Sequence, residues 1–298
     1  MSPSPEIDCL VIGGGAAGLV AATYLGRYRR RAIVVDAGAS RLQRIPRSRN
    51  VPGFPQGIAG GELWQRLREQ ALAFGARIEE GCVDSLAPLE GGFEARAGDR
   101  AWRARFVILA TGASDVLPEL AGLEAGLERG HVRCCPICDA YETAGQRVAV
   151  LGRGEHGLAE ALFVAHFGNQ VTWLSLQSQQ AAPPEALARL RERGVRIADR
   201  VPRQVRCRDG TFIEVEMEGG EVLAFDVIYP ALGLVHACEL ATRLGAAARA
   251  DGQLVVDDHM QTTVPGLYAA GDVAVDLNQI SVAFGHAAIA ATAIHNRL

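Results

Sequence analysis

The stretch that decides the fold is Ile7-Asp8-Cys9-Leu10-Val11-Ile12-Gly13-Gly14-Gly15-Ala16-Ala17-Gly18. An apolar run of strand length comes first, glycines follow at once, and residues 19–28, rich in Ala and Leu, are typical of a helix. The next strand, over residues 32–35, ends on Asp36. Glycines let the backbone approach a pyrophosphate, a helix N-terminus attracts its charge, and a carboxylate at the second strand's end accepts hydrogen bonds from a ribose. This pattern predicts a dinucleotide-binding unit; the alternative is a glycine-tightened turn that binds no ligand.

The same pattern returns in the middle of the chain. A strand over residues 147–151 leads into Gly152, Gly154 and Gly157, and then come a helix over 158–167 and a strand over 170–174. Two such units predict an α/β protein with two Rossmann-like dinucleotide-binding domains, the second inserted into the first.

The second copy lacks two features that a pyridine nucleotide needs. Its second strand is followed by Ser175-Leu176-Gln177, which has neither a carboxylate for a ribose nor an arginine for a 2′-phosphate. Arg153 also places a bulky cation between the first two glycines. The three glycines mark a second nucleotide site by pattern, but we do not expect NADPH or NADH to bind it well.

Composition excludes several classes of function. The 298 residues include 30 basic and 34 acidic side chains, and a net charge of −4 is no footprint for nucleic acid or an anionic membrane. No apolar run approaches the roughly 20 residues of a membrane span, and the N-terminus does not look like a cleaved signal, so we expect a cytoplasmic protein. All basic residues are arginine, which excludes both a GxxxxGK phosphate loop and Schiff-base chemistry on lysine.

Three of the seven cysteines lie close together, and two of them form the most informative motif, Cys135-Pro136-Ile137-Cys138-Asp139. Two cysteines three apart on a turn or first helical turn lie within the Cα separation that a disulfide tolerates. Pro136 suits the first position of a helix, so Cys135 would be its cap residue, where the helix dipole favours a thiolate. Asp139 supplies a carboxyl suited to moving the proton that dithiol chemistry gains or loses.

Two other interpretations of this cluster remain open. His131, Cys134, Cys135 and Cys138 are in principle four metal ligands, although a closed zinc site usually draws on two separated pairs and the sequence has no second pair. The cysteines could instead be buried structural thiols, an odd use of two thiols that flank a proline beside an acid. The redox pair is the interpretation that we favour, with no metal site.

The order of motifs along nearly the whole chain resembles that of the low-molecular-weight thioredoxin reductases. These motifs are the first glycine unit, Ala110-Thr111-Gly112, the CxxC-Asp motif, the second glycine unit and Gly271-Asp272. The resemblance implies a homodimer, an FAD-binding domain made of residues 1–115 and 246–298, and an inserted pyridine-nucleotide-like domain over 116–245 that carries the disulfide. It also implies that Cys138 faces the flavin, that Cys135 attacks the substrate disulfide and that Asp139 is the acid–base residue. The FAD-binding residues implied are Gly13, Gly15, Ala16, Ala17, Gly18, Asp36, Ala37, Arg41, Asn50, Val83, Ala110, Thr111, Gly112, Asp272, Gln279 and Ile280.

Three segments depart from the family's pattern. Residues 175–181 stand where the family has an arginine-bearing segment that grips NADPH, residues 39–42 replace its Gly-Gly-Gln-Leu, and residues 233–236 lack its Gly-x-x-Pro-Asn. We therefore predict an FAD-dependent disulfide oxidoreductase that passes electrons to a thioredoxin-like protein or a small disulfide, with a donor other than NADPH. Two alternatives remain: an oxygen-using dithiol oxidase acting on a small metabolite, and a flavin-binding redox sensor without turnover.

Overall fold

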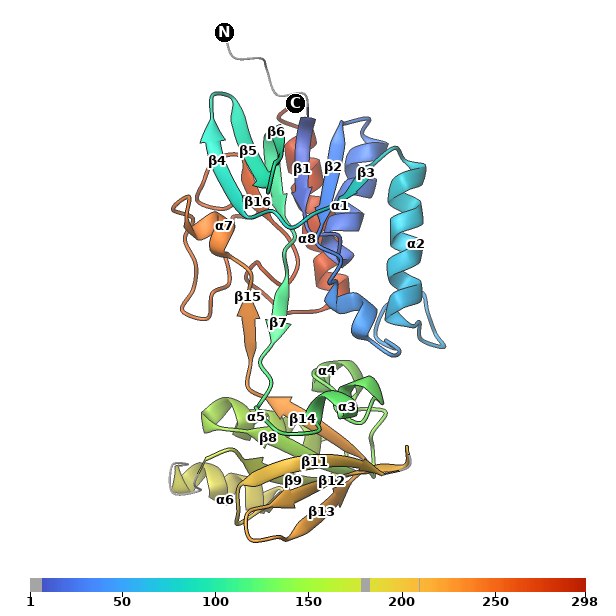
Figure 1. Cartoon of the computed structure of the whole chain (residues 1–298), viewed down its shortest axis with the longest axis vertical. Helices are drawn as coiled ribbons and strands as arrows, with labels where there is room; N and C mark the ends of the chain where they lie inside the picture. The colour runs from blue at the N-terminus through green and yellow to red at the C-terminus, as the bar shows by residue number, and fades with distance from the viewer. Residues whose placement is uncertain (1–6, 178–182, 209) are drawn as a thin grey trace. The chain divides into compact units, whose positions relative to one another are not determined.

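The computed structural model describes residues 7–177, 183–208 and 210–298. The chain forms two compact units, residues 1–114 with 235–298, and residues 115–234. The strands β7 (Ala113–Asp115) and β15 (Leu234–His236) form a two-stranded sheet and contain the points at which the chain leaves and re-enters the first unit (Figure 1).

The second boundary lies earlier than the position after residue 245 that the sequence suggested. The helix α7 (Glu239–Thr242) follows β15, and its Ala241 is fully buried in the core of the first unit. Leu240 and Leu244 pack against the same core. Apolar packing therefore assigns residues 235–245 to the first unit.

The first unit is built on a seven-stranded sheet with the order β3-β2-β1-β6-β5-β4, and β16 also pairs with β6. The long strand β6 has two neighbours on one edge, because β5 pairs antiparallel with its first half and β16 pairs parallel with its last residues. The helices α1 and α8 pack together, and the ring of Tyr28, directly after α1, stacks on that of His295 with the ring centroids 4.4 Å apart. The bounds of the unit's strands are β1 (Ile7–Ile12), β2 (Ala32–Asp36), β3 (Arg77–Glu80), β4 (Ser85–Leu89), β5 (Gly92–Ala97), β6 (Arg100–Leu109) and β16 (Leu267–Ala269). Its other helices are α1 (Ala16–Arg27), η1 (Arg41–Arg44), α2 (Gly60–Ala73) and α8 (Ile280–His295).

The second unit has a parallel four-stranded sheet, in the order β10-β9-β8-β14, and an antiparallel three-stranded sheet of β11, β12 and β13. The parallel strands are β8 (Arg147–Gly152), β9 (Gln170–Ser175), β10 (Arg196–Ile197) and β14 (Val227–Ala231). The antiparallel strands are β11 (Pro202–Arg208), β12 (Phe212–Met217) and β13 (Val222–Phe225), and the helices are α3 (Leu123–Glu128), α4 (Pro136–Asp139), α5 (Gly154–Ala165) and α6 (Pro184–Glu192).

Both faces of this parallel sheet are covered, so its central strand β8 is apolar from Val148 to Leu151. Val148 and Val150 of β8 join the core beneath α5 and α6, whereas Ala149 and Leu151 join the core shared with the antiparallel sheet. The alternation follows from the two-residue period of a strand.

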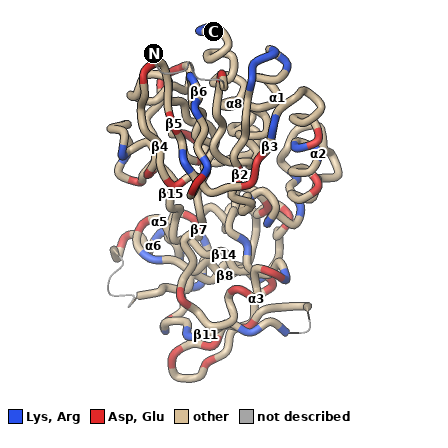
Figure 2. The backbone as a smooth tube through the Cα atoms, turned by 45° about the horizontal axis from the view of Figure 1, so that its top comes forward, with Lys and Arg blue, Asp and Glu red and all other residues tan. Residues whose placement is uncertain are grey.

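Charged residues of both signs are interspersed along the chain in both units (Figure 2). On β11 and β12 they pair across the strands, as in Arg206 with Glu216 (2.9 Å) and Arg208 with Glu214 (2.7 Å). Within the described residues, no helix is long and apolar enough to cross a membrane.

Candidate functional site

In the first unit, the carboxyl ends of four parallel strands meet at one edge of the sheet. The register places four residues side by side in the order β2-β1-β6-β16: Asp36, which ends β2, and Gly13, Ala110 and Ala270, which directly follow the other three strands. This edge is where open α/β sheets bind their ligands. The backbone hydrogen bonds that join the ends are Gly13 N–H to Val35 O (2.8 Å), Ala110 N–H to Ile12 O (2.8 Å) and Ala270 N–H to Leu109 O (2.9 Å).

The glycines of the first motif have separate roles. Gly13 has φ +110°, and a Cβ on it would collide with the carbonyl group of Ala110. A Cβ on Gly18 would collide with the carbonyl oxygen of Gly13, so this glycine lets α1 pack closely on β1. Gly15 caps α1 without a side-chain hydrogen bond, and the space beside it holds only the Ser40 hydroxyl oxygen, 3.4 Å from the position of a Cβ. The N–H groups of the first turn, including those of Ala16 and Ala17, are therefore available to an anion.

The two predicted carboxylates lie at ends of strands in this sheet. Asp36 Oδ1 accepts hydrogen bonds from the N–H groups of Gly14 and Gly38, both at 3.2 Å. Asp272 lies just beyond β16, and its Oδ2 accepts a hydrogen bond from the guanidinium of Arg41 at 3.2 Å. Two segments far apart in sequence thus meet around Asp272.

A second long-range pair joins the amide Nδ2 of Asn50 to the side-chain oxygen of Gln279, at 2.8 Å. Gln279 is the cap residue of α8, so Ile280 is the first residue of that helix. Thr111 donates its hydroxyl proton to Ala237 O at 2.6 Å, and Gly112 takes φ +70°. Of the remaining predicted residues, Ala37 is exposed and Val83 packs against the core.

These observations fit a flavin dinucleotide. The uncapped start of α1 offers N–H groups to a pyrophosphate, and Asp36 lies where a ribose hydroxyl would need an acceptor. Asp272 is a second carboxylate at the same edge, whereas one carboxylate is enough to bind a ribose.

The second glycine motif keeps the close packing of the first, but the strand that follows it ends on Ser175 and not on a carboxylate. Gly152 and Gly157 approach closely, since a Cβ on Gly157 would lie 2.9 Å from the Gly152 Cα. Gly154 takes φ +60° at the start of α5, and Arg153 is the exposed cap residue before it. At the end of β9, the Ser175 hydroxyl accepts the Gln177 N–H at 3.3 Å, in a local turn where the first motif has a carboxylate. Residues 178–181 of the predicted departure lie outside the described residues.

Cys135 and Cys138 form a disulfide with a Cα–Cα distance of 5.3 Å, as their spacing predicted. Pro136 is the first residue of α4 and Cys135 is the cap, and the Cys138 N–H bonds to the Cys135 carbonyl at 3.0 Å. Among the described residues, no three His, Cys, Asp or Glu side chains are grouped as metal ligands would be.

The carboxyl group of Asp139 is held from two sides. Tyr229 donates its hydroxyl proton to Oδ1 at 2.6 Å, and the Arg133 guanidinium donates to Oδ2 at 3.2 Å. Burial raises the pKa of Asp139, while Tyr229 and Arg133 oppose that rise. Burial beside the carboxylate also raises the pKa of Tyr229, so this tyrosine is a hydrogen-bond donor at neutral pH.

The sequence-based prediction missed both of these partners. Arg133 lies two residues before Cys135, and an arginine so close to an acid-bearing motif was a usable signal. Tyr229 lies 90 residues from Asp139, and it reaches this part of the unit because β14 pairs with β8 and the segment before the disulfide runs alongside β14.

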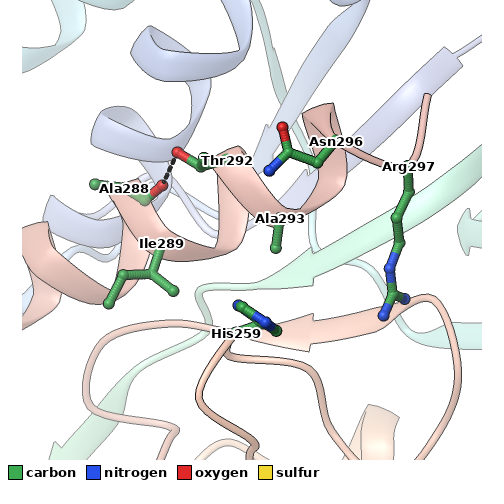
Figure 3. A pocket seen from close by; sticks show the side chains of 7 residues that line it. All are labelled: His259, Ala288, Ile289, Thr292, Ala293, Asn296 and Arg297. Atoms are coloured by element: carbon green, nitrogen blue, oxygen red, sulfur yellow. Dashed lines mark hydrogen bonds between the residues drawn. The ribbon is translucent and has the colours of Figure 1, made fainter.

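A hollow beside the second half of α8 contains none of the predicted residues. It is lined by His259, Ala288, Ile289, Thr292, Ala293, Asn296 and Arg297 (Figure 3). Ala288 lies eight residues beyond Ile280, which corresponds to about 12 Å along the helix. None of the residues at the strand ends lines this hollow.

Comparisons with known proteins agree with this geometry. The family described as pyridine nucleotide-disulphide oxidoreductase matches residues 7–287. The chain is 31% identical over 289 residues to the thioredoxin reductase of Aquifex aeolicus, with 91% of this chain and 86% of that protein covered. It is 30% identical over 297 residues to that of Treponema pallidum, with 97% and 96% covered. The crystal structure of thioredoxin reductase from Streptococcus pyogenes matches with a TM-score of 0.89, 27% identity and 97% of each chain covered. The chain therefore belongs to the low-molecular-weight thioredoxin reductase family and is a flavoprotein disulfide oxidoreductase.

Proposed function

We propose that this chain binds FAD in its first unit and passes electrons between the flavin and the Cys135–Cys138 disulfide, and from there to a thioredoxin-like protein. The observation that carries the proposal is the disulfide at the start of α4 with the carboxyl of Asp139 directly after it. A disulfide and an adjacent proton carrier are the two elements that dithiol–disulfide exchange requires.

The proposed FAD site uses the edge where the four strand ends meet. The first turn of α1 would receive the pyrophosphate, Asp36 a ribose, and Asp272 with Arg41 the chain that leads to the flavin ring. Asn50 and Gln279, already joined at 2.8 Å, would lie at the ring. Bound FAD supplies a two-electron carrier.

The two sulfurs have different proposed roles. Reducing the disulfide takes two electrons and two protons and gives two thiols. Cys138 would face the electron source, and Cys135, the cap residue of α4, would attack the substrate disulfide. Attack needs a thiolate, so one proton must leave a thiol and return later to the departing sulfur. Asp139, which directly follows Cys138, would take and return that proton.

We further propose that NADPH is a poor electron donor. The support is local: Ser175 stands where a ribose-binding carboxylate would be, and its hydroxyl already accepts the Gln177 N–H. Leu176 and Gln177 offer no cation to a 2′-phosphate, and charge-assisted contacts to phosphate are about twice as strong as neutral ones. Arg153, at the entrance to the helix, would obstruct the path of the pyrophosphate.

The absence of a carboxylate or cation for NADPH at residues 175–177 also favours a second candidate function, an oxygen-using oxidase that takes electrons from a small dithiol. Electrons would then flow from the substrate through the Cys135–Cys138 pair to the flavin, and no nicotinamide would be needed. A protein that lacks a grip on NADPH and keeps its disulfide is suited to that direction of flow.

Anaerobic titration of the purified holoprotein with NADPH, NADH and then dithionite, followed at the flavin absorption band, tests the proposals together. We expect about one FAD per chain from the single complete fingerprint, slow or partial bleaching by either nucleotide, and full bleaching by dithionite. A preparation that carries no flavin and binds none when FAD is added would contradict the FAD site. Rapid, complete bleaching by micromolar NADPH would contradict the weak-donor proposal.

Two further measurements separate the candidate functions. Adding a dithiol such as dihydrolipoamide under air should bleach the flavin and consume oxygen catalytically if the chain is an oxidase. If it is a reductase, dithionite-reduced protein should reduce thioredoxin, and oxygen uptake should stay at the background rate. The predicted homodimer is also a proposal, which sedimentation equilibrium of the holoprotein tests.

A further inference from the structure

Two side chains from outside the four-residue helix α4 hold the carboxyl group of Asp139, beside the disulfide. Both oxygens of Asp139 are engaged, Oδ1 by the Tyr229 hydroxyl at 2.6 Å and Oδ2 by the Arg133 guanidinium at 3.2 Å. The Asp139 side chain is 23% exposed and that of Arg133 is 32% exposed, whereas Tyr229 is completely buried. Two donors in a half-buried place restrict the rotation of the carboxyl group and favour its ionised form.

Both donors depend on the same strand. Tyr229 belongs to β14, and its ring lies in the core beneath α5 and α6. The segment before the disulfide runs alongside this strand, because Val132 pairs with Ile228 and the Arg133 N–H bonds to the Ile228 carbonyl at 2.9 Å. The Arg133 side chain is anchored a second time, by its Nε to Gly130 O at 3.1 Å. One rigid element therefore positions both groups.

We propose that Tyr229 and Arg133 are positioning residues that hold the Asp139 carboxylate ready to accept a proton from the Cys135–Cys138 dithiol. This inference rests on the proposed function, in which Asp139 is the acid–base residue of the exchange reaction. The two residues act through Asp139 and need no contact with the substrate.

The proton balance shows why the ionised form matters. When the dithiol reduces a disulfide, two S–H bonds and the substrate's S–S bond break, and the protein's S–S bond and two S–H bonds on the substrate form. Two electrons pass from the dithiol to the substrate, and two protons follow them. A carboxylate takes the first proton as Cys135 attacks and gives it to the leaving sulfur, whereas a carboxyl that is already protonated cannot begin this sequence.

The sign of the effect follows from the groups around Asp139. Those that act on it in the described structure are Tyr229 on β14, Arg133 before α4, and Glu142 in the turn after α4. Burial and the negative charge of Glu142 favour the protonated carboxyl, and the two donors favour the carboxylate. Removing either donor should therefore raise the pH at which Asp139 loses its proton.

The test follows the dithiol alone and does not depend on the electron donor. Holoprotein reduced with excess dithiothreitol and desalted without oxygen is mixed with dithiobis(nitrobenzoate), and the rate of release of the coloured thiolate is measured between about pH 5 and 9. The variants are Tyr229→Phe, Arg133→Gln and Asp139→Asn. Tyr268→Phe is the matched control, because Tyr268 is as buried as Tyr229 and its hydroxyl has no hydrogen-bond partner in the described residues.

We expect the acid limb of the rate profile to move up by about one pH unit in Tyr229→Phe, a roughly tenfold loss of rate on that limb, since a hydrogen bond to a charged group has about that effect. Arg133→Gln should move the limb in the same direction, and it remains informative if Tyr229→Phe does not fold. Tyr268→Phe should match the wild type. If the folded donor variants keep the wild-type profile while Asp139→Asn loses the limb, the inference is wrong and the acid–base role of Asp139 stands. If Asp139→Asn also keeps the wild-type profile, that part of the proposed function fails with it.

Discussion

Glu160 on α5 should make the stability of the protein depend on pH, and replacing it with glutamine should remove that dependence. Burial raises the pKa of Glu160 from 4.5 to about 7. Its Oε2 has no hydrogen-bond partner within the described residues, so nothing there compensates the charge on that oxygen. Oε1 lies 3.4 Å from the His156 Nε2, but the His156 side chain is 56% exposed, so water screens this pair.

The sign and size of the pH effect follow from the linkage between the ionisation of Glu160 and folding. Between pH 4.5 and about 7, the folded chain keeps the Glu160 proton and the unfolded chain releases it, so the wild type loses stability as the pH rises through this window. At 1.36 kcal/mol per pKa unit the loss would be at most about 3 kcal/mol, and we expect about 1–2 kcal/mol because water screens part of the charge. The Glu160 side chain is 25% exposed, which is the reason for the reduction.

The assay is urea unfolding of the holoprotein at several values between about pH 5 and 8.5, with Glu160→Gln compared with the wild type at each pH. The variant should gain relative stability as the pH rises and reach a plateau above pH 7. Glu119→Gln, which changes an exposed glutamate of the same unit, is the control and should give a constant difference. A difference for Glu160→Gln that does not change with pH would refute the reasoning, and so would an equal trend in the control.

Two further predictions concern the motifs that define the site. Gly18→Ala should lower the free energy of unfolding by about 3 kcal/mol, at the upper end for overpacking, because its methyl group would collide with the Gly13 carbonyl oxygen. Gly15→Ala should unfold like the wild type in urea and yet bind FAD more weakly in equilibrium dialysis. Cys138→Ser should stop electron flow from reduced flavin to the disulfide site without loss of FAD. Cys135→Ser should leave a Cys138 thiolate that gives a long-wavelength absorption band with the flavin. Disulfide-reducing activity at the wild-type rate in both variants would exclude this pair as the redox site.

The order of the strands and helices that flank both glycine motifs could be predicted, but the starts of the helices could not. We expected helices from residues 19 and 158, and the structure begins them at Ala16 and Gly154. Helix propensity penalises glycine, yet the glycine-rich turn is already the first turn of each helix. Close packing of helix against strand outweighs the propensity cost at Gly18 and Gly157.

The antiparallel sheet of the second unit was missed although its pattern was available. In β12, Ile213, Val215 and Met217 are buried and alternate with Glu214 and Glu216. This alternation is the period of a half-buried strand. A search for that period, and not for nucleotide motifs alone, would have found β12.

The partners of Asp139 show what a single sequence withholds. The CxxC-Asp motif predicts a disulfide and a carboxyl group from local spacing alone, and the structure confirms the disulfide. The environment of the carboxyl group depends on a contact between residues 139 and 229, which follows from sheet topology and not from spacing. The sequence therefore predicts the disulfide and the carboxyl group beside it, but it does not show which groups control the ionisation of that carboxyl.

The two glycine motifs of this chain show why a glycine pattern is weaker support for a ligand than the residue at the end of the next strand. Gly157 lies against Gly152, and Gly18 lies against Gly13, so both motifs keep glycines that helix–strand packing demands even when no ligand is present. Packing places no such demand on the strand end, where the first motif has a carboxylate and the second has Ser175, whose hydroxyl serves a local turn. The proposal that NADPH binds the second motif poorly therefore rests on its strand end and not on its glycines.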